Sequence, residues 1–248
     1  MRISAGTRNR PRVAAIVTEP IMCNNGGVMP VPGFLEGLRQ RCTARGIVLI
    51  FDEVITGFRV GLGGAQGLLG VTPDLAIFSK AIANGMPIGC VGGRRDIMEL
   101  VATRRVVHAG TFNGNAACVA AALATLDELE RDPDRLYAGL FARSRRLMEG
   151  LRAAAVDAGQ PVLVQGPGPV FFSLVTPRPG VRNYRDTLDA DGAAYARFCA
   201  AMLEAGIRLV PVGRWYVSFS HTDADVDQTI AVARTAWRQT RAAGQDHA

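Results

Sequence analysis

The chain has 248 residues, of which 48% are hydrophobic and 20% are charged, and its formal net charge is +6. This composition is typical of a globular protein with ample core material. No run of about 18 apolar residues occurs, so we expect no membrane-spanning helix. The 28 basic residues are 27 arginines and a single lysine, Lys80. Because they are scattered in short pairs without interleaved aromatic residues, we expect no nucleic-acid partner.

The cysteines and histidines exclude two further kinds of site. The five cysteines are widely spaced and form no CxxC pair. Their odd number argues against a disulfide framework and predicts a cytoplasmic location. The three histidines share no ligand spacing, so we expect no metal centre.

The first half of the sequence alternates apolar runs with helical patterns. The run at 47–51 lacks polar alternation, as expected for a parallel strand covered on both faces, and the runs at 13–18 and 75–78 also indicate buried strands. We expect strands at 13–18, 47–51, 75–78 and 88–92, helices from Phe34 to a cap at Gly46 and over 116–130, and a glycine-rich loop at 61–70. This alternation predicts an α/β sheet.

A charged run near residue 130, interrupted by Pro133, marks a change of composition. We therefore divide the chain into a partial large domain, residues 1–130, and a smaller α+β domain, residues 131–248. In the second part, leucines at 136, 140, 147 and 151 share one helix face. We expect strands at 162–165, 170–175 and 215–220, a loop at 176–192, a helix through Phe198 and Met202, and a last helix from Thr222 or Asp223.

Three of the predicted strands end in charged residues, namely Glu19, Asp52 and Lys80. In an open parallel sheet, ligands bind beyond the carboxyl ends of the strands, so these side chains should face one crevice. An alternative interpretation is that Asp52 and its neighbour Glu53 are ordinary polar residues at a strand end. In the same way, Lys80 could be a solvated surface amine. The apolar and glycine-rich flanks of Lys80 argue against the surface interpretation.

The chemistry of lysine separates Lys80 from the arginines. A desolvated lysine loses its proton readily, and the neutral amine is a nucleophile that condenses with carbonyls. Arginine stays charged and does not react in this way. A carboxylate such as Asp52 opposite a reactive lysine is suited to pyridoxal phosphate, whose pyridine nitrogen is held protonated by an acid.

Four segments together resemble the class III aminotransferases, which are fold-type I enzymes dependent on pyridoxal phosphate. They are EPIMCNNGGVMP (19–30), LIFDEVITGFR (49–59), FSKAIANGMPIGCVGG (78–93) and GTFNGN (110–115). The closing RWYVSFSHTDADVDQTI is similar to the glutamate-1-semialdehyde 2,1-aminomutase subgroup. The resemblance covers about residues 13–240 and implies the carboxyl-terminal part of a large parallel-sheet domain followed by a small α+β domain.

The resemblance implies a role for each motif residue. Lys80 would be the Schiff-base lysine and the proton shuttle, and Asp52 would pair with the pyridine nitrogen. Val54 would pack on one face of the ring. Thr111 would bind the cofactor phosphate of a neighbouring subunit, which implies a homodimer. Glu19 would lie near the cofactor, or would serve as a helix cap or structural hydrogen-bond acceptor.

The chain departs from the family pattern in two respects. Family members carry a further amino-terminal segment that supplies a phosphate cup and much of the substrate pocket, so we expect this sequence to represent the remaining part. Asn24 stands where ω-amino-acid transaminases often have glutamate, which favours the aminomutase side. Arg214 is either a carboxylate-binding residue or a surface arginine.

These observations predict amino-group transfer on a small-molecule amine or amino acid, by a transaminase or an aminomutase. Two alternatives stay open. The chain could be a truncated or split fragment that is inactive without a partner half, or a racemase or epimerase that uses the same lysine. The residues that set substrate specificity in this family lie largely in the missing segment.

Overall fold

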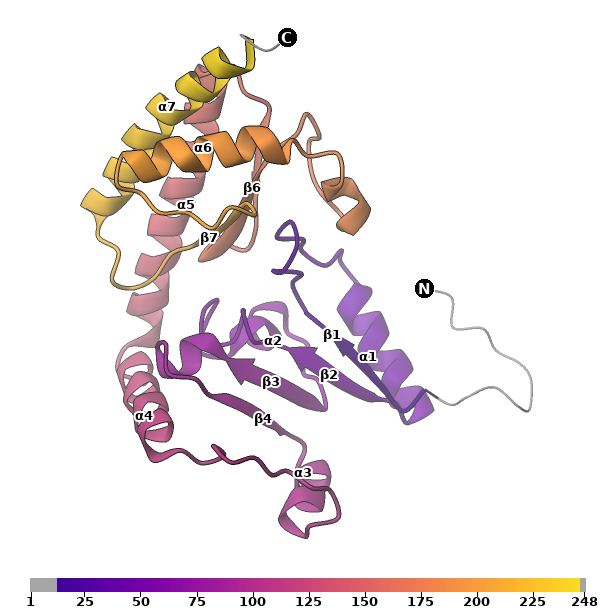
Figure 1. The fold of residues 1–248 in the computed structure, drawn as a ribbon. Helices are drawn as coiled ribbons and strands as arrows, with labels where there is room; N and C mark the ends of the chain where they lie inside the picture. The colour runs from indigo at the N-terminus through magenta and orange to yellow at the C-terminus, as the bar shows by residue number, and fades with distance from the viewer. Residues whose placement is uncertain (1–12, 246–248) are drawn as a thin grey trace, which may run out of the picture.

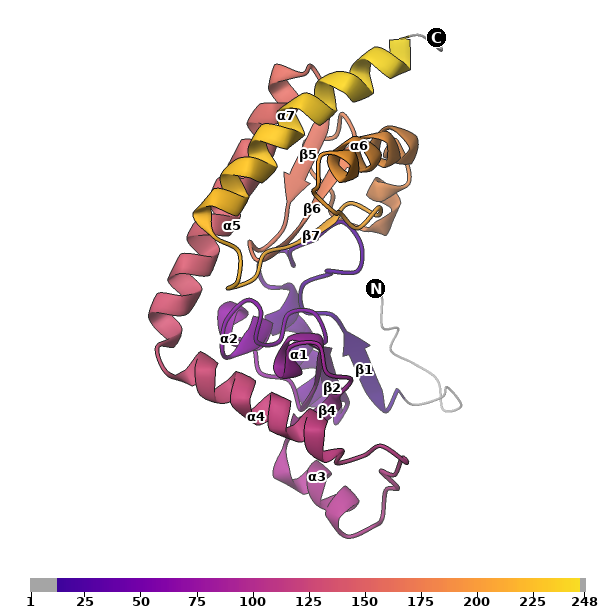
Figure 2. The ribbon, with the colours of Figure 1, turned by 60° about the vertical axis from the view of Figure 1, so that its left-hand side comes forward.

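A computed structural model describes residues 13–245, which form two β-sheets flanked by helices (Figures 1 and 2). The arginine-rich start of the predicted large domain, residues 1–12, lies outside the described residues. The elements are, in chain order, β1 (Ala15–Thr18), α1 (Phe34–Arg45), β2 (Val48–Asp52), α2 (Gly64–Leu69), β3 (Leu75–Ser79), the 3₁₀ helix η1 (Lys80–Ala83), β4 (Gly89–Gly93), α3 (Arg95–Ala102), α4 (Ala116–Glu130), α5 (Pro133–Asp157), β5 (Val162–Gln165), β6 (Val170–Val175), the 3₁₀ helix η2 (Tyr184–Thr187), α6 (Gly192–Glu204), β7 (Arg214–Tyr216) and α7 (Asp223–Gln245).

The first sheet has the strand order β1-β2-β3-β4. β1, β2 and β3 are parallel, and β4 is antiparallel to β3. Thr18 lies opposite Phe51, and Asp52 lies opposite Ile77. The carboxyl ends of the three parallel strands therefore meet at one edge of the sheet, as the sequence predicts.

Helix α1 covers this sheet with a small apolar face. Leu35 and Cys42 are buried with Leu49 and Phe51 of β2. The helix ends as expected at Gly46, whose φ of 62° is left-handed and whose backbone N–H bonds to the carbonyls of the last turn. Glycine carries no Cβ penalty in that conformation, which explains this stop.

The segment at 61–70 differs from the sequence-based expectation, because it holds the short helix α2 rather than a loop throughout. The buried carboxylate of Glu53 accepts hydrogen bonds from the backbone N–H groups of Ala65 and Gln66 at its start. Those donors have no partner within the helix, so an acceptor from a distant residue stabilises the first turn. This contact could not be seen in the local sequence.

The second sheet is antiparallel, with the order β5-β6-β7, and α5, α6 and α7 pack against it. Its core includes the stacked rings of Phe198 and Trp237, whose centroids are 3.8 Å apart. The strand expected at 215–220 is shorter in the structure, because β7 ends at Tyr216. The backbone N–H of Ser218 donates to His221 Nδ1, which turns the chain toward α7.

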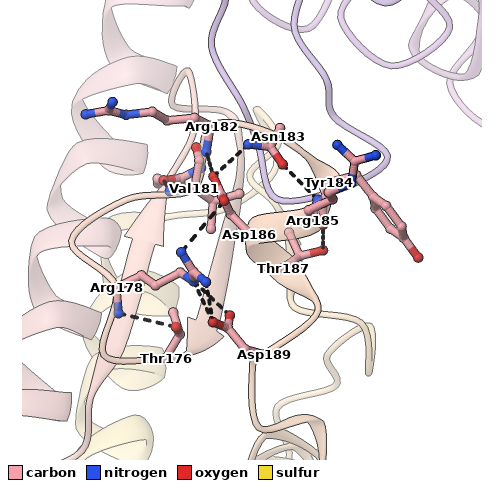
Figure 3. Close-up of polar contacts among 11 residues, drawn as sticks. Thr176, Arg178, Val181, Arg182, Asn183, Tyr184, Arg185, Asp186, Thr187 and Asp189 are labelled. Carbon is pink, nitrogen blue, oxygen red and sulfur yellow. Dashed lines mark hydrogen bonds and ion pairs between the residues drawn. The ribbon is translucent and has the colours of Figure 1, made fainter.

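The loop between β6 and α6 is ordered by ion pairs and short hydrogen bonds (Figure 3). Arg178 Nε donates to both carboxylate oxygens of Asp189, at 2.9 and 2.7 Å. Asp186 Oδ2 accepts hydrogen bonds from the backbone N–H of Arg182 and the side chain of Asn183. The predicted loop at 176–192 therefore contains the 3₁₀ helix η2 and a defined polar network.

Gln165 joins this loop to the segment that follows β1. Its Nε2 donates to the carbonyls of Gly26 (2.7 Å) and Val181 (3.0 Å), and its Oε1 accepts from Val181 N–H. The segment after β1 is thus fixed against the second sheet as well as the first. Within residues 13–245, no helix is both long and apolar enough to span a bilayer.

Candidate active site

Glu19, Asp52 and Lys80 lie together at the carboxyl edge of the parallel strands. The pairing of Thr18 with Phe51 sets Glu19 level with Asp52, and Lys80 directly follows β3. Both carboxylates act electrostatically on the Lys80 amine. The structure therefore brings together the three strand-end residues that the sequence predicts.

Lys80 adopts a backbone conformation that is uncommon for a lysine. Its φ of 49° is in the left-handed region, as is that of Phe58 (57°) in the loop after β2. A residue with a Cβ pays about 1–2 kcal/mol in this region, and such strain concentrates at functional sites. The conformation is consistent with a side chain whose direction matters.

The surroundings lower the pKa of Lys80 below that of a free lysine. Desolvation is the largest cause, followed by the positive charges of Arg214 and Arg59, while Asp52 and Glu19 act in the opposite direction. A lowered pKa increases the fraction of neutral amine, which is the nucleophilic form.

The adjacent acids Asp52 and Glu53 have different surroundings. Asp52 is half-buried, and its Oδ1 accepts a hydrogen bond from Val54 N–H at 3.0 Å. Glu53 is fully buried and accepts four hydrogen bonds from the loop and helix that follow it. The donors are Thr56 Oγ1, Ala65 N, Gln66 N and Gln66 Nε2. Glu53 is therefore a structural acceptor, whereas Asp52 lies at the carboxyl end of β2 with one oxygen that receives no hydrogen bond from residues 13–240.

Glu19 holds the loop that follows β1. Its Oε2 accepts from the backbone N–H groups of Cys23 (2.9 Å) and Asn24 (3.1 Å), and its Oε1 accepts from the Asn24 side chain (3.0 Å). Burial, with a smaller contribution from Glu19, raises the pKa of the Cys23 thiol to about 12. The structural hydrogen-bonding role considered for Glu19 is thus present in the structure.

Two arginines complete the charged surroundings of Lys80. Arg59 was not singled out from the sequence, although it lies within the LIFDEVITGFR segment. Arg214 is partly buried, and its Nη2 donates to the Asn24 carbonyl at 2.9 Å. The structure therefore shows Arg214 as a partly buried residue, because β7 brings its side chain against the loop that Glu19 holds, and its role as a carboxylate-binding residue stays a prediction.

Thr111 is not part of this cluster. It lies exposed in the segment between α3 and α4, and it is not among the residues that line the cavity beside Lys80. Val54 is half-buried beside Asp52. The roles implied for these two residues stay predictions.

Comparison with known proteins identifies the family. Residues 3–235 match the family model described as aminotransferase class-III. The chain belongs to the class III aminotransferases. It is 42% identical over 231 residues to a glutamate-1-semialdehyde 2,1-aminomutase of Desulfatibacillum aliphaticivorans, covering 92% of this chain and 54% of that protein. The class III chain thus spans about half the length of the curated relatives it matches.

Solved structures of similar fold support the same assignment. An ω-transaminase from Sphaerobacter thermophilus has a TM-score of 0.85 and 31% identity, covering 92% of this chain and 52% of that one. A transaminase with PLP bound has a TM-score of 0.84 and 28% identity, covering 94% and 54%. The predicted fold class, a mixed α/β fold with a parallel sheet of the fold-type I transaminase kind, is confirmed.

Proposed function

We propose that this chain is the pyridoxal-phosphate-binding region of an enzyme that transfers amino groups between small molecules, with Lys80 as the covalent attachment point. One observation carries the proposal. The only lysine of the sequence stands at the carboxyl end of β3, beside Asp52 at the end of β2 and with two arginines nearby. Family membership supports the same activity.

The side chains present fit the cofactor. Asp52 offers an oxygen that accepts no hydrogen bond from residues 13–240, and a carboxylate there would hold the pyridine N–H. Lys80 offers an amine whose pKa is lowered mainly by desolvation. Val54 would contact the ring face. Pyridoxal phosphate, when bound, supplies an electron-accepting ring that stabilises negative charge on the substrate carbon.

Lys80 would have two tasks in the reaction. Its neutral amine would be the group that holds the cofactor covalently. Lys80 Nζ would also take up the proton removed from the substrate carbon and return it to a neighbouring carbon. Return of the amino group to the same molecule gives an aminomutase, and release of an oxo product gives a transaminase. The similarity to an aminomutase and the presence of Asn24 favour the first.

The test is covalent attachment at a defined residue. The purified chain is incubated with pyridoxal phosphate, reduced with borohydride and digested, and the peptide containing residue 80 is examined by mass spectrometry. We expect a reduced cofactor adduct on Lys80. Lys80→Arg, which keeps the positive charge but cannot condense, should carry none. An unmodified Lys80 in the wild type, or an adduct mapped elsewhere, contradicts the proposal.

We also propose a homodimer, in which the segment around Thr111 reaches the cofactor phosphate of a second copy. Val107 and Phe112 flank Thr111 and are 86% and 82% exposed. Large apolar side chains so exposed commonly mark an interaction surface. Sedimentation analysis should give a dimer that Phe112→Asp weakens. The substitution Val156→Asp is a control, since Val156 is also exposed but lies on α5.

Three further assignments belong to this proposal. Residues 1–130 would form the partial cofactor-binding domain and residues 131–248 the small domain, joined at the start of α5. Glu19 would support the site by fixing the Cys23–Asn24 backbone. A cytoplasmic location agrees with the five free cysteines. Limited proteolysis would test the boundary, because the first cut should fall near residue 131.

A further inference from the structure

The hydroxyl of Tyr137 joins the two parts of the chain close to the candidate active site. Tyr137 lies near the start of α5, which begins beside the first sheet and runs along the second (Figure 1). Its Oη donates a hydrogen bond to the Phe58 carbonyl at 2.8 Å, across 79 positions of sequence. Burial raises the pKa of Tyr137 to about 12, so the hydroxyl stays protonated at neutral pH and remains a donor.

Phe58 is a residue whose backbone needs such support. Its φ of 57° is left-handed, a conformation that is strained for a residue with a Cβ and persists only where the surroundings enforce it. Its ring lies 5.4 Å from that of Phe78, which stands two residues before Lys80. The preceding Gly57 has no room for a side chain, since a Cβ would lie 2.6 Å from Phe78 Cδ1. The strained turn is therefore held by the end of β3 on one side and by α5 on the other.

The Phe58 carbonyl belongs to the peptide unit that leads to Arg59. Because this unit is planar, the direction of the carbonyl fixes the plane that contains the N and Cα atoms of Arg59. At the far end of its side chain, the Arg59 guanidinium carbon lies 4.8 Å from the centroid of the Tyr216 ring, whose face attracts a cation. Arg59 is thus fixed at both ends, its backbone through Tyr137 and its charged group by Tyr216.

Arg59 and Lys80 line the same open cavity of about 510 Å³. The titratable side chains that interact electrostatically with the Lys80 amine come from several elements. They are Arg214 of β7, Arg59 after β2, Asp52 at the end of β2, and Glu19 and Cys23 after β1. After desolvation, the two arginines are the largest causes of the lowered pKa of Lys80, because they disfavour a further positive charge. Moving Arg59 away would therefore leave more of the amine protonated.

We propose that Tyr137 is a positioning residue for Lys80. By holding the Phe58 carbonyl, it keeps Arg59 beside the lysine amine and makes the reactivity of Lys80 depend on the contact between α5 and the loop after β2. This inference rests on the proposed function and adds a means of control to the same site. Separation of the two parts of the chain at this contact would release Arg59 and return Lys80 toward its protonated, unreactive form.

The experiment titrates Lys80 in the full chain without cofactor. Acetic anhydride is applied across a pH series, and mass spectrometry of the peptide that contains Lys80 gives a midpoint and a limiting rate at high pH. Tyr137→Phe removes only the hydroxyl and should move the midpoint upward, so that the acetylation rate at neutral pH falls about 3-fold. The limiting rate should stay unchanged, because it reports access to the amine rather than its charge.

The variant keeps the packing of the tyrosine ring. The Tyr137 ring lies edge-on to that of Phe219, with centroids 5.5 Å apart, and phenylalanine preserves this contact. Tyr195→Phe is the matched control. It removes another buried hydroxyl, which Ser173 contacts at 3.3 Å and which does not line the cavity beside Lys80. It should leave the midpoint unchanged.

A double variant decides whether Tyr137 acts through Arg59. Arg59→Met should itself move the midpoint upward, and adding Tyr137→Phe to it should move the midpoint no further, because residues that act on one path are not additive. A general loosening of the site would instead give a second upward shift. A wild-type midpoint in Tyr137→Phe, or an undiminished further shift in the Arg59→Met background, overturns the proposal.

The result can be separated from a failure of the proposed function. If the midpoints shift as expected while Lys80 carries no reduced cofactor adduct, the proposed function fails and the positioning role of Tyr137 stands. If the adduct forms on Lys80 while Tyr137→Phe titrates as the wild type does, the positioning role fails and the proposed function stands.

Discussion

The two ends of β3 carry charged residues in opposite situations. Asp74 precedes the strand, is buried, and binds Arg39 at 2.8 Å, Arg94 at 3.0 Å and the Leu49 backbone N–H at 2.7 Å. Lys80 follows the strand, where Arg59 and Arg214 have no acidic partner within residues 13–240. The same five-residue strand thus separates a group whose partners are complete from one whose partners are not.

The difference between the two ends of β3 distinguishes a group that serves stability from one that serves function. A saturated buried acid holds neighbouring elements in place and has little to offer a ligand. Unsatisfied donors and a strained backbone are retained only where the surrounding structure enforces them, and they are the features expected of a binding or catalytic site. Substitutions at the two ends of β3 should therefore change different measurable properties.

The largest effect on stability is expected for Asp74→Ala. It removes the acceptor of a buried backbone N–H and the acid between two arginines, so the free energy of unfolding should fall by about 3 kcal/mol. Asp96→Ala is the control, because Asp96 pairs with the same Arg94 but is exposed, and it should change little. Urea unfolding measures both, and equal losses would show that the burial of Asp74 is not what matters.

Lowering the pH should reveal the same difference between the two ends of β3. Desolvation raises the pKa of Asp74, but hydrogen bonds from Leu49, Arg94 and Arg39 outweigh it and hold the pKa below its ordinary value. A depressed folded-state pKa gives stability that is present above the unfolded pKa, about 3.9, and is lost as the pH falls through the folded value. Asp74→Asn should remove this part of the acid destabilisation.

A second, smaller stability effect is expected at Gly64, which lies against the saturated Glu53. Gly64 has a φ of 61°, and a Cβ there would lie 2.9 Å from Glu53 Cδ. Gly64→Ala should therefore cost about 2 kcal/mol, from backbone strain and from disturbance of the Glu53 hydrogen bonds. Gly70→Ala is matched in φ, at 67°, but has open space, and should cost about 1 kcal/mol. Equal losses in thermal unfolding would show that contact with Glu53 is unimportant.

The sequence predicts the scaffold of the site well, because it is encoded locally. Apolar runs without alternation indicate the parallel strands, and Glu19, Asp52 and Lys80 stand directly at their ends. Their common edge then follows from the rule that parallel strands end together. Most helices also follow from local patterns, as the left-handed Gly46 cap shows for α1.

The remainder depends on contacts between distant residues. Helix α2 begins where Glu53, twelve residues earlier, supplies an acceptor to Ala65 N–H. Arg214 reaches the site only because β7 pairs with β6 and brings it to the Asn24 carbonyl. The lack of a partner for Arg59 is likewise a property of the assembled structure, since any sequence offers many acids that could have paired with it.

At the other end of β3, replacing Lys80 should separate its chemistry from its backbone strain. Lys80→Ala and Lys80→Gly both remove the amine, but only glycine adopts a φ of 49° without a Cβ penalty. Lys80→Gly should therefore be more stable than Lys80→Ala by about 1 kcal/mol in urea unfolding, and neither should bind the cofactor covalently. A less stable glycine variant would mean that the left-handed conformation imposes no strain.

The smallest change is expected in the titration of Lys80 itself. Arg214 lowers the pKa of Lys80, because one positive charge disfavours another nearby, and Asp52 raises it. Arg214→Met should therefore move the pH at which Lys80 becomes reactive upward, and Asp52→Asn should move it downward. Acetylation by acetic anhydride across a pH series measures both shifts, with the adduct assigned to the single lysine by mass spectrometry.

The opposite signs of these two shifts are what make the measurement decisive. A general loosening of the site would expose Lys80 to water in either variant, and since desolvation is the largest cause of the lowered pKa, it would raise the pKa in both. Only charges that act directly on the amine give an upward shift in one variant and a downward shift in the other. Asp74→Asn, at the far end of the same strand, should leave the titration of Lys80 unchanged, because Asp74 is not among the charges that act on it.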